Sequence, residues 1–126
     1  MSMIVSVALG GAIGSVARYL AVMQVGRWLG AGFPWGTLAV NVLGGMLIGA
    51  LAEAMALKWS ASPEIRAFLI TGVLGGFTTF SAFSLEVVAL AQRGAVVAAA
   101  AYIVASVALS VAAAVVGLML VRWVAA

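Results

Sequence analysis

The most informative stretch of this chain is Gly75-Gly76-Phe77-Thr78-Thr79-Phe80-Ser81-Ala82-Phe83-Ser84. It lies in the middle of a segment that is long and apolar enough to cross a membrane. A spanning helix satisfies its backbone groups internally, because hydrocarbon offers no hydrogen-bond partner. The two adjacent glycines and the nearby hydroxyl residues weaken the helix, and such a break is tolerated only where protein or a water-filled cavity receives the freed groups. The stretch therefore predicts a helix break over the Gly-Gly-Phe-Thr segment at 75–78 and an ion or substrate site near mid-membrane.

The composition of the whole chain is that of a membrane protein. Of its 126 residues, 67% are hydrophobic and only 7% are charged. In a soluble domain, about a quarter of the residues are charged. The sequence contains no cysteine and no histidine, which excludes disulfides, zinc sites built on these residues and imidazole proton relays. The six basic residues are scattered along the chain, which argues against a nucleic-acid surface.

Four segments are long enough to cross a bilayer, which takes about 20 apolar residues. They cover residues 3–25, 35–57, 65–91 and 95–122. The separators between them are short, and all four tryptophans fall near segment ends, where amphipathic rings favour the membrane interface. We therefore expect an all-α membrane protein with four transmembrane helices in one domain over residues 1–126. We expect its first segment to be a retained span and not a signal peptide.

The basic residues give no preferred orientation in the membrane. If both termini lie on one side, that side receives Lys58, Arg66 and Arg122, and the other receives Arg27, Arg93 and Arg18. Positive residues are the main determinant of orientation, and here they balance. Two explanations stay open. The basic residues are too few for their distribution to indicate an orientation, or the protein has dual topology, in which copies insert both ways and pair antiparallel.

Small residues predict close helix contacts. Gly10 and Gly14 in the first segment, and Gly45 and Gly49 in the second, are spaced four residues apart, which lets helix backbones approach each other. The fourth segment has alanine-rich faces. These surfaces fit packing within one chain or between two copies, and a single four-helix chain is small for an aqueous pathway.

Asn41 is the clearest buried polar residue of the second segment, and Thr37 lies one turn before it. An amide among valines and leucines needs a hydrogen-bond partner. One interpretation is an interhelical hydrogen bond. The other is a donor offered to a passing anion, because asparagine has two N–H donors and no charge that would trap the ion. Thr37 belongs to the same candidate pore-lining set.

Further polar residues lie in the first and fourth segments. Arg18 sits late in the first segment, where its side chain either snorkels to the interface or forms a positive vestibule that attracts anions. Tyr102, Ser106 and Ser110 are spaced four residues apart and share one helix face. The serines either bond back to their own helix or, with the tyrosine, form a hydroxyl ladder along a pathway.

Phe80 and Phe83 follow the expected break directly. The edge of an aromatic ring carries positive quadrupole character, so beside a broken helix these rings can face an anion that has shed water. The chain has only three acidic residues, Glu53, Glu64 and Glu86. None forms a catalytic pair with a base in the sequence, and we expect no enzymatic activity.

Three motifs follow one another in this order along the chain. They are Gly-Gly-Ala-Ile-Gly-Ser-Val-Ala-Arg at 10–18, Gly-Thr-Leu-Ala-Val-Asn-Val-Leu-Gly at 36–44, and the stretch at 75–84 quoted above. The first is weak alone and the third is specific. In combination the chain resembles the Fluc (CrcB) family of fluoride ion channels along essentially its whole length.

The resemblance implies an antiparallel dual-topology homodimer in the lipid bilayer, with two fluoride pores and a central sodium ion that is structural and not transported. It implies that Asn41 is the pore-lining amide and that Phe80 and Phe83 turn their ring edges to fluoride. Ser81, between the two rings, is a weaker candidate.

The resemblance also implies roles for the remaining candidates. The backbone carbonyls of Gly75 and Thr78 would hold the sodium ion, and Arg18 matches the arginine that closes the first motif. A polar track along the fourth helix would consist of Tyr102, Ser106 and Ser110.

The expected function is passive fluoride export across the cytoplasmic (inner) membrane of a prokaryote, which reduces fluoride toxicity. The first alternative is a small multidrug-type exporter, which needs a membrane-buried acid in its first span, and the first and fourth segments contain no Asp or Glu. The second is a membrane scaffold, which would explain the glycine packing but not Asn41 combined with a mid-span break. A test for proton dependence separates exporter from channel, and a test for ion flux separates both from a scaffold.

Overall fold

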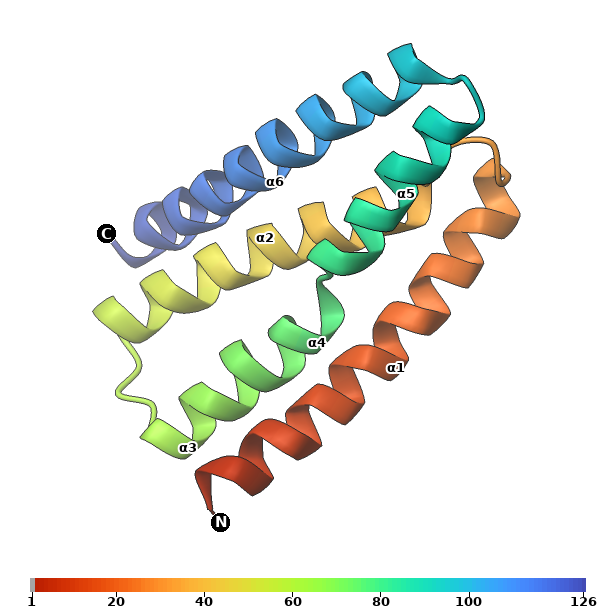
Figure 1. Ribbon diagram of the computed structural model, residues 1–126. Helices are drawn as coiled ribbons and strands as arrows, with labels where there is room; N and C mark the ends of the chain where they lie inside the picture. Colours follow the sequence, from red (N-terminus) through yellow and green to blue (C-terminus); the bar gives the residue numbers. More distant parts are fainter. Residues whose placement is uncertain (1) are drawn as a thin grey trace.

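A computed structural model describes residues 2–126, and every element within that range is helical. Figure 1 shows the helices as a bundle of roughly antiparallel rods. Along the chain they are α1 (Met3–Leu29), α2 (Trp35–Leu57), α3 (Pro63–Arg66), the π-helical η1 (Ala67–Leu74), α4 (Gly75–Phe77), α5 (Phe80–Gln92) and α6 (Val96–Ala125). Elements α3 to α5 together form the third span, Pro63–Gln92, so four helices are long and apolar enough to cross a membrane. This confirms the expected all-α class and the number of spans.

Local sequence signals set several of the helix ends. The hydroxyl of Ser2 accepts a hydrogen bond from the backbone N–H of Val5 at 3.1 Å and caps α1. Ser62 caps α3 in the same way, with Pro63 at the first helical position, where its missing N–H costs nothing. Gly30 and Gly94 follow α1 and α5 with φ of 85° and 82°, a conformation that favours glycine. These signals place the turns that separate the spans.

The third span is not one continuous α-helix. Thr78 (φ −92°, ψ 158°) and Thr79 (φ −151°, ψ 122°) have extended backbone between α4 and α5, and we call these two residues the interruption. The sequence predicts a break over the segment 75–78; Thr78 is extended, but the prediction is wrong for Gly75 and Gly76, since both glycines are helical. The reason is contact with α1, because a Cβ on Gly76 would meet the carbonyl oxygen of Gly11 at 2.8 Å.

Glycines bring the helices into close contact within the chain, as their spacing predicts. On α1, a Cβ at Gly10 or Gly14 would collide with backbone of η1, at Phe68 and Val73 respectively. A Cβ at Gly45 would lie 2.7 Å from the carbonyl oxygen of Ser110 on α6. Such contacts leave no room for side chains, so they fix how far each helix lies from the next.

Charged residues contribute one further link between α2 and α6. Arg122 pairs with Glu53, with 2.7 Å between its Nη2 and the Oε2 of the carboxylate. The Glu53 side chain is buried, whereas that of Arg122 is largely exposed. Among residues 2–126 this is the single ion pair, so the rest of the bundle is held by apolar packing and neutral hydrogen bonds.

Candidate functional site

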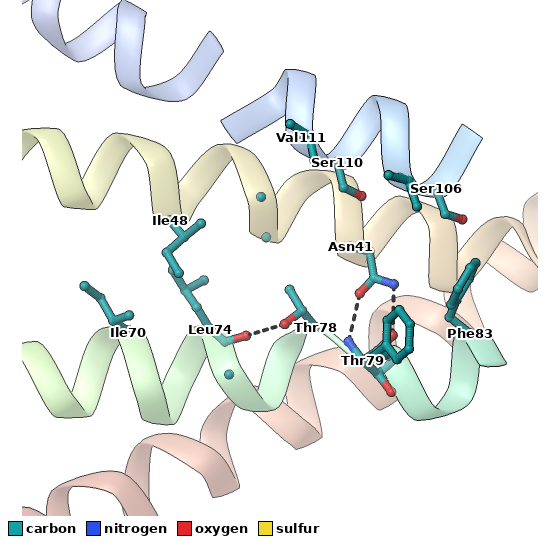
Figure 2. Close-up of a pocket in the computed structure, with 15 residues that line it drawn as sticks. Asn41, Ile48, Ile70, Leu74, Thr78, Thr79, Phe83, Ser106, Ser110 and Val111 are labelled. Carbon is teal, nitrogen blue, oxygen red and sulfur yellow. Dashed lines mark hydrogen bonds between the residues drawn. The ribbon is translucent and has the colours of Figure 1, made fainter. Parts of the chain in front are cut away.

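A cavity of about 420 Å³ lies beside the interruption, between α2, the third span and α6. Figure 2 shows its walls. The structure brings together seven of the eleven candidate pore-lining and sodium-binding residues: Asn41, Gly75, Thr78, Phe80, Phe83, Ser106 and Ser110. Aliphatic side chains such as Ile48 and Leu74 make up much of the remaining wall, and no charged side chain lines this cavity. We call it the central cavity.

The two threonines of the interruption close the helix ends on either side. The Thr78 hydroxyl donates to the carbonyl of Leu74 at 3.0 Å, and the Thr78 N–H donates to the same oxygen at 3.0 Å. The Thr79 hydroxyl accepts from the N–H of Ala82 at 3.1 Å and caps α5. A threonine side chain thus satisfies a backbone group at each end of the break, in the way that N-caps and back-bonding hydroxyls do.

Asn41 holds the interruption through both atoms of its amide. Its Nδ2 donates to the carbonyl of Thr79 at 3.0 Å, and its Oδ1 accepts from the N–H of Thr79 at 2.8 Å (Figure 2). This is the interhelical hydrogen bond that the sequence left open as one interpretation. The amide has two N–H donors, and only one of them is used in this pair. Asn41 is half-buried and lines the central cavity, so the second N–H is free to bind a ligand there.

Phe80 and Phe83 form an aromatic pair at the cavity wall. Their ring centroids lie 5.3 Å apart, with an angle of 47° between the ring planes. Phe83 is only 7% exposed, whereas Phe80 is 76% exposed. On α6 the Ser106 hydroxyl is buried without a hydrogen-bond partner among the described residues. The wall of the cavity thus contains an amide with a spare N–H donor and two aromatic rings, with an unpaired serine hydroxyl buried beside them.

Thr37 and Tyr102 belong to a different cluster from the one expected. Tyr102 donates to one oxygen of Glu86 at 2.9 Å, and Thr37 donates to the other at 3.0 Å. Thr37 and Glu86 line a second cavity of about 300 Å³ at the end of the bundle, together with Arg93. Neither Thr37 nor Tyr102 lines the central cavity, so the polar face of α6 is divided between two sites.

This cluster was not predicted from the sequence, because its members lie on three different helices. The only available signal was that Glu86 within a span needs a buried partner. Tyr102 is nevertheless close to the central cavity, since its ring centroid lies 5.1 Å from that of Phe83. Tyr102 therefore contacts Glu86, which lines the second cavity, and Phe83, which lines the central one.

Arg18 and Ser81 line neither cavity. The Nε of Arg18 donates to the carbonyl of Gly76 at 3.0 Å, so its side chain binds the middle of the third span and does not snorkel to the interface. Ser81 is exposed, with its hydroxyl 3.4 Å from that of Thr79. Because Arg18 lies near mid-membrane, it counts toward neither side, and the balance of basic residues between the two sides becomes three against two.

The polar groups of the central cavity are neutral, and among residues 2–126 no group of three His, Cys, Asp or Glu residues gathers as a metal site. Neutral N–H and O–H donors in an apolar wall can replace the water molecules around a small anion without binding it too tightly to leave. The arrangement is suited to passage of an ion.

Known proteins resemble the chain over nearly its full length. The family model described as "CrcB-like protein, Camphor Resistance (CrcB)" matches residues 5–118. A "Fluoride-specific ion channel FluC" from Rhodospirillum centenum is 55% identical over 97% of each chain. The protein of that name from Rhizobium meliloti is 57% identical over 97% of this chain and 98% of its own. A third, from a Chelativorans species, is 60% identical over 92% of this chain and 93% of its own. These relatives are named as channels and not as enzymes, and the chain, a multi-pass membrane protein with four spans, belongs to the CrcB-like protein family.

Proposed function

We propose that this protein is a fluoride-selective channel that exports fluoride passively from the cytoplasm across the inner membrane and so reduces fluoride toxicity. The observation that carries the proposal is the central cavity, where the spare Asn41 donor, the Phe83 ring and the Ser106 hydroxyl meet beside the interruption. The identity of the ion comes from the relatives, which are named as fluoride-specific ion channels. A membrane potential of ~100 mV supplies about 2.3 kcal/mol per charge, so a negative interior expels fluoride without a coupling ion.

Each group in the central cavity has a role in this proposal. The spare N–H of Asn41 and the hydroxyls of Ser106 and Ser110 donate hydrogen bonds to the anion. The edges of Phe80 and Phe83 present the positive part of the ring quadrupole. Glu86, held by Thr37 and Tyr102, lies on the route toward the second cavity. Passage across the Tyr102 ring would join the two cavities.

We propose further that the working unit is an antiparallel homodimer with dual topology and two pores. Phe80 is exposed in the single chain, and large apolar residues are exposed along α1 and α6. Lipid covers some of this surface, but Phe80 borders the central cavity, which holds hydrogen-bonding groups and which a partner copy would close. The near balance of basic residues between the two sides supports insertion in both orientations.

The proposal includes a structural sodium ion between the two copies. Gly75 and Thr78 both line the central cavity, and their carbonyls are not among those occupied by Thr78, Asn41 and Arg18. Neutral carbonyl oxygens without carboxylates suit a hard monovalent cation. Two carbonyls from each copy would supply four oxygen ligands, and the ion would stabilise the contact between two interrupted helices.

Efflux from liposomes tests the proposal. Purified protein in fluoride-loaded vesicles should release fluoride as soon as an ionophore relieves the charge imbalance, and chloride-loaded vesicles should release almost none. Flux should need no proton gradient and no sodium gradient. When a large organic cation replaces sodium on both sides, the dimer should lose activity. Flux that strictly requires an ion gradient would point to an exporter, and activity indifferent to sodium removal would refute the sodium site.

Loop charges test dual topology. Ala56→Lys with Ser60→Lys adds two positive charges beside the α2–α3 loop, and Ala31→Lys with Gln92→Lys adds two at the opposite end of the bundle. Each double variant should insert one way and be inactive alone, and co-expression of the two should restore fluoride resistance in cells. A native protein whose N-terminus is accessible from one side only would contradict dual topology.

A further inference from the structure

The face of α1 that contacts the third span carries a regular stripe. Gly10, Gly14 and Arg18 follow one another at intervals of four residues and share one side of the helix. A Cβ on either glycine would collide with the backbone of η1, so α1 lies directly against the third span there. Arg18 is the next residue on this stripe, and it reaches the third span with a long side chain at the level where α4 ends.

The Arg18 contact falls on a carbonyl that the helix itself leaves open. Gly76 lies in α4, which ends at Phe77, and the residue four positions later, Phe80, begins a new helix. The last carbonyls of a helix have no partner inside it, and at membrane depth no bulk water replaces that partner. A cation is also favoured at a helix C-terminus. The 3.0 Å bond from Arg18 Nε therefore satisfies a group that otherwise stays unpaired.

Arg18 acts on the backbone, since it lines neither cavity and forms no ion pair among residues 2–126. Asn41 binds the other side of the interruption, at Thr79. We propose that Arg18 is a positioning residue that fixes the end of α4 and thereby keeps the interruption in register with Asn41 and the central cavity. The effect of Arg18 on fluoride flux rests on the proposed function, whereas its effect on how far the backbone of the interruption is protected does not.

The test compares Arg18→Ala with Tyr19→Ala, which also truncates a long side chain, at an exposed residue of the same helix, and leaves the loop charges unchanged. Hydrogen–deuterium exchange of the segment 76–83 should become at least about tenfold faster in Arg18→Ala only, as expected on losing a hydrogen bond from a charged donor. Fluoride flux should fall by a similar factor, with an unchanged half-saturating fluoride concentration. Ethylguanidinium, which restores the missing group, should recover part of both signals in Arg18→Ala.

Several outcomes would overturn the proposal. Unchanged exchange in segment 76–83 means that Arg18 does not hold the interruption, and a shifted half-saturating concentration with unchanged exchange means that it acts on the anion. If Arg18→Ala does not assemble, Arg18→Lys should protect the segment and Arg18→Met should not, and equal exchange in these two variants refutes the proposal. If the unmodified protein carries no fluoride, the proposed function fails while the exchange readout still decides the role of Arg18.

Discussion

Asn41→Asp is expected to reduce fluoride flux at least about 100-fold while the protein still assembles. The change replaces the Nδ2 donor with a carboxylate oxygen. Two oxygens, that of the carboxylate and that of the Thr79 carbonyl, then face each other, and the hydrogen bond between the side chain and this carbonyl is lost. It also places a negative charge beside the central cavity. Two like charges 4 Å apart repel by about 4 kcal/mol at an effective dielectric constant of 20, which exceeds the roughly 2.7 kcal/mol of a 100-fold change in rate.

Gln92→Glu is the matched control, because it makes the same amide-to-acid change at an exposed residue at the end of α5. It should conduct like the parent. The measurement is fluoride efflux from liposomes, with size-exclusion chromatography as the check on assembly. If Asn41→Asp gives near-normal efflux, Asn41 neither holds the interruption nor meets the anion.

Phe80→Ile and Phe83→Ile are each expected to lower fluoride flux at least about tenfold. Isoleucine keeps the site apolar and fills much of its volume, but it lacks the positive ring edge that an anion would meet. Phe80 is 76% exposed, so its replacement should not unfold the chain. Phe83 packs against the Tyr102 ring, and loss of such a pair costs about 0.5–1.5 kcal/mol, which a stable membrane bundle tolerates.

Phe68→Ile provides the control for these two variants, because Phe68 lies in η1 and lines neither cavity. Initial efflux rates at equal amounts of reconstituted protein give the comparison. Should Phe80→Ile and Phe83→Ile both conduct like Phe68→Ile, the two rings serve packing alone.

Much of the fold could be predicted because its causes are local. Length and hydropathy alone mark the four spans, and Ser2, Ser62 and Gly94 mark helix ends by capping or by positive φ. The glycine spacing predicts close helix contacts because the absence of a side chain acts directly on the distance between helices. Such features depend on a residue and its near neighbours.

The location of the interruption was less predictable. Glycine has a low helix propensity, which points to Gly75 and Gly76 as the weak point. Contact with α1 outweighs this low propensity, because only a residue without a side chain fits against Gly11. The helix therefore continues through both glycines. The amide of Asn41 then satisfies the backbone of Thr79 outside a helix.

Sequence patterns were sufficient to predict an all-helical membrane protein with four spans, the family it belongs to, and a polar weak point in the third span. The partners of the polar side chains depend on how the helices pack: Asn41 meets Thr79, Arg18 meets Gly76, and Glu86 meets Thr37 and Tyr102. These partners come from different helices. Periodicity gives the face of a helix on which a side chain lies, but the rotation and depth of one helix against the next are set by close contacts such as those of Gly14 and Gly45, and these form only when the bundle packs.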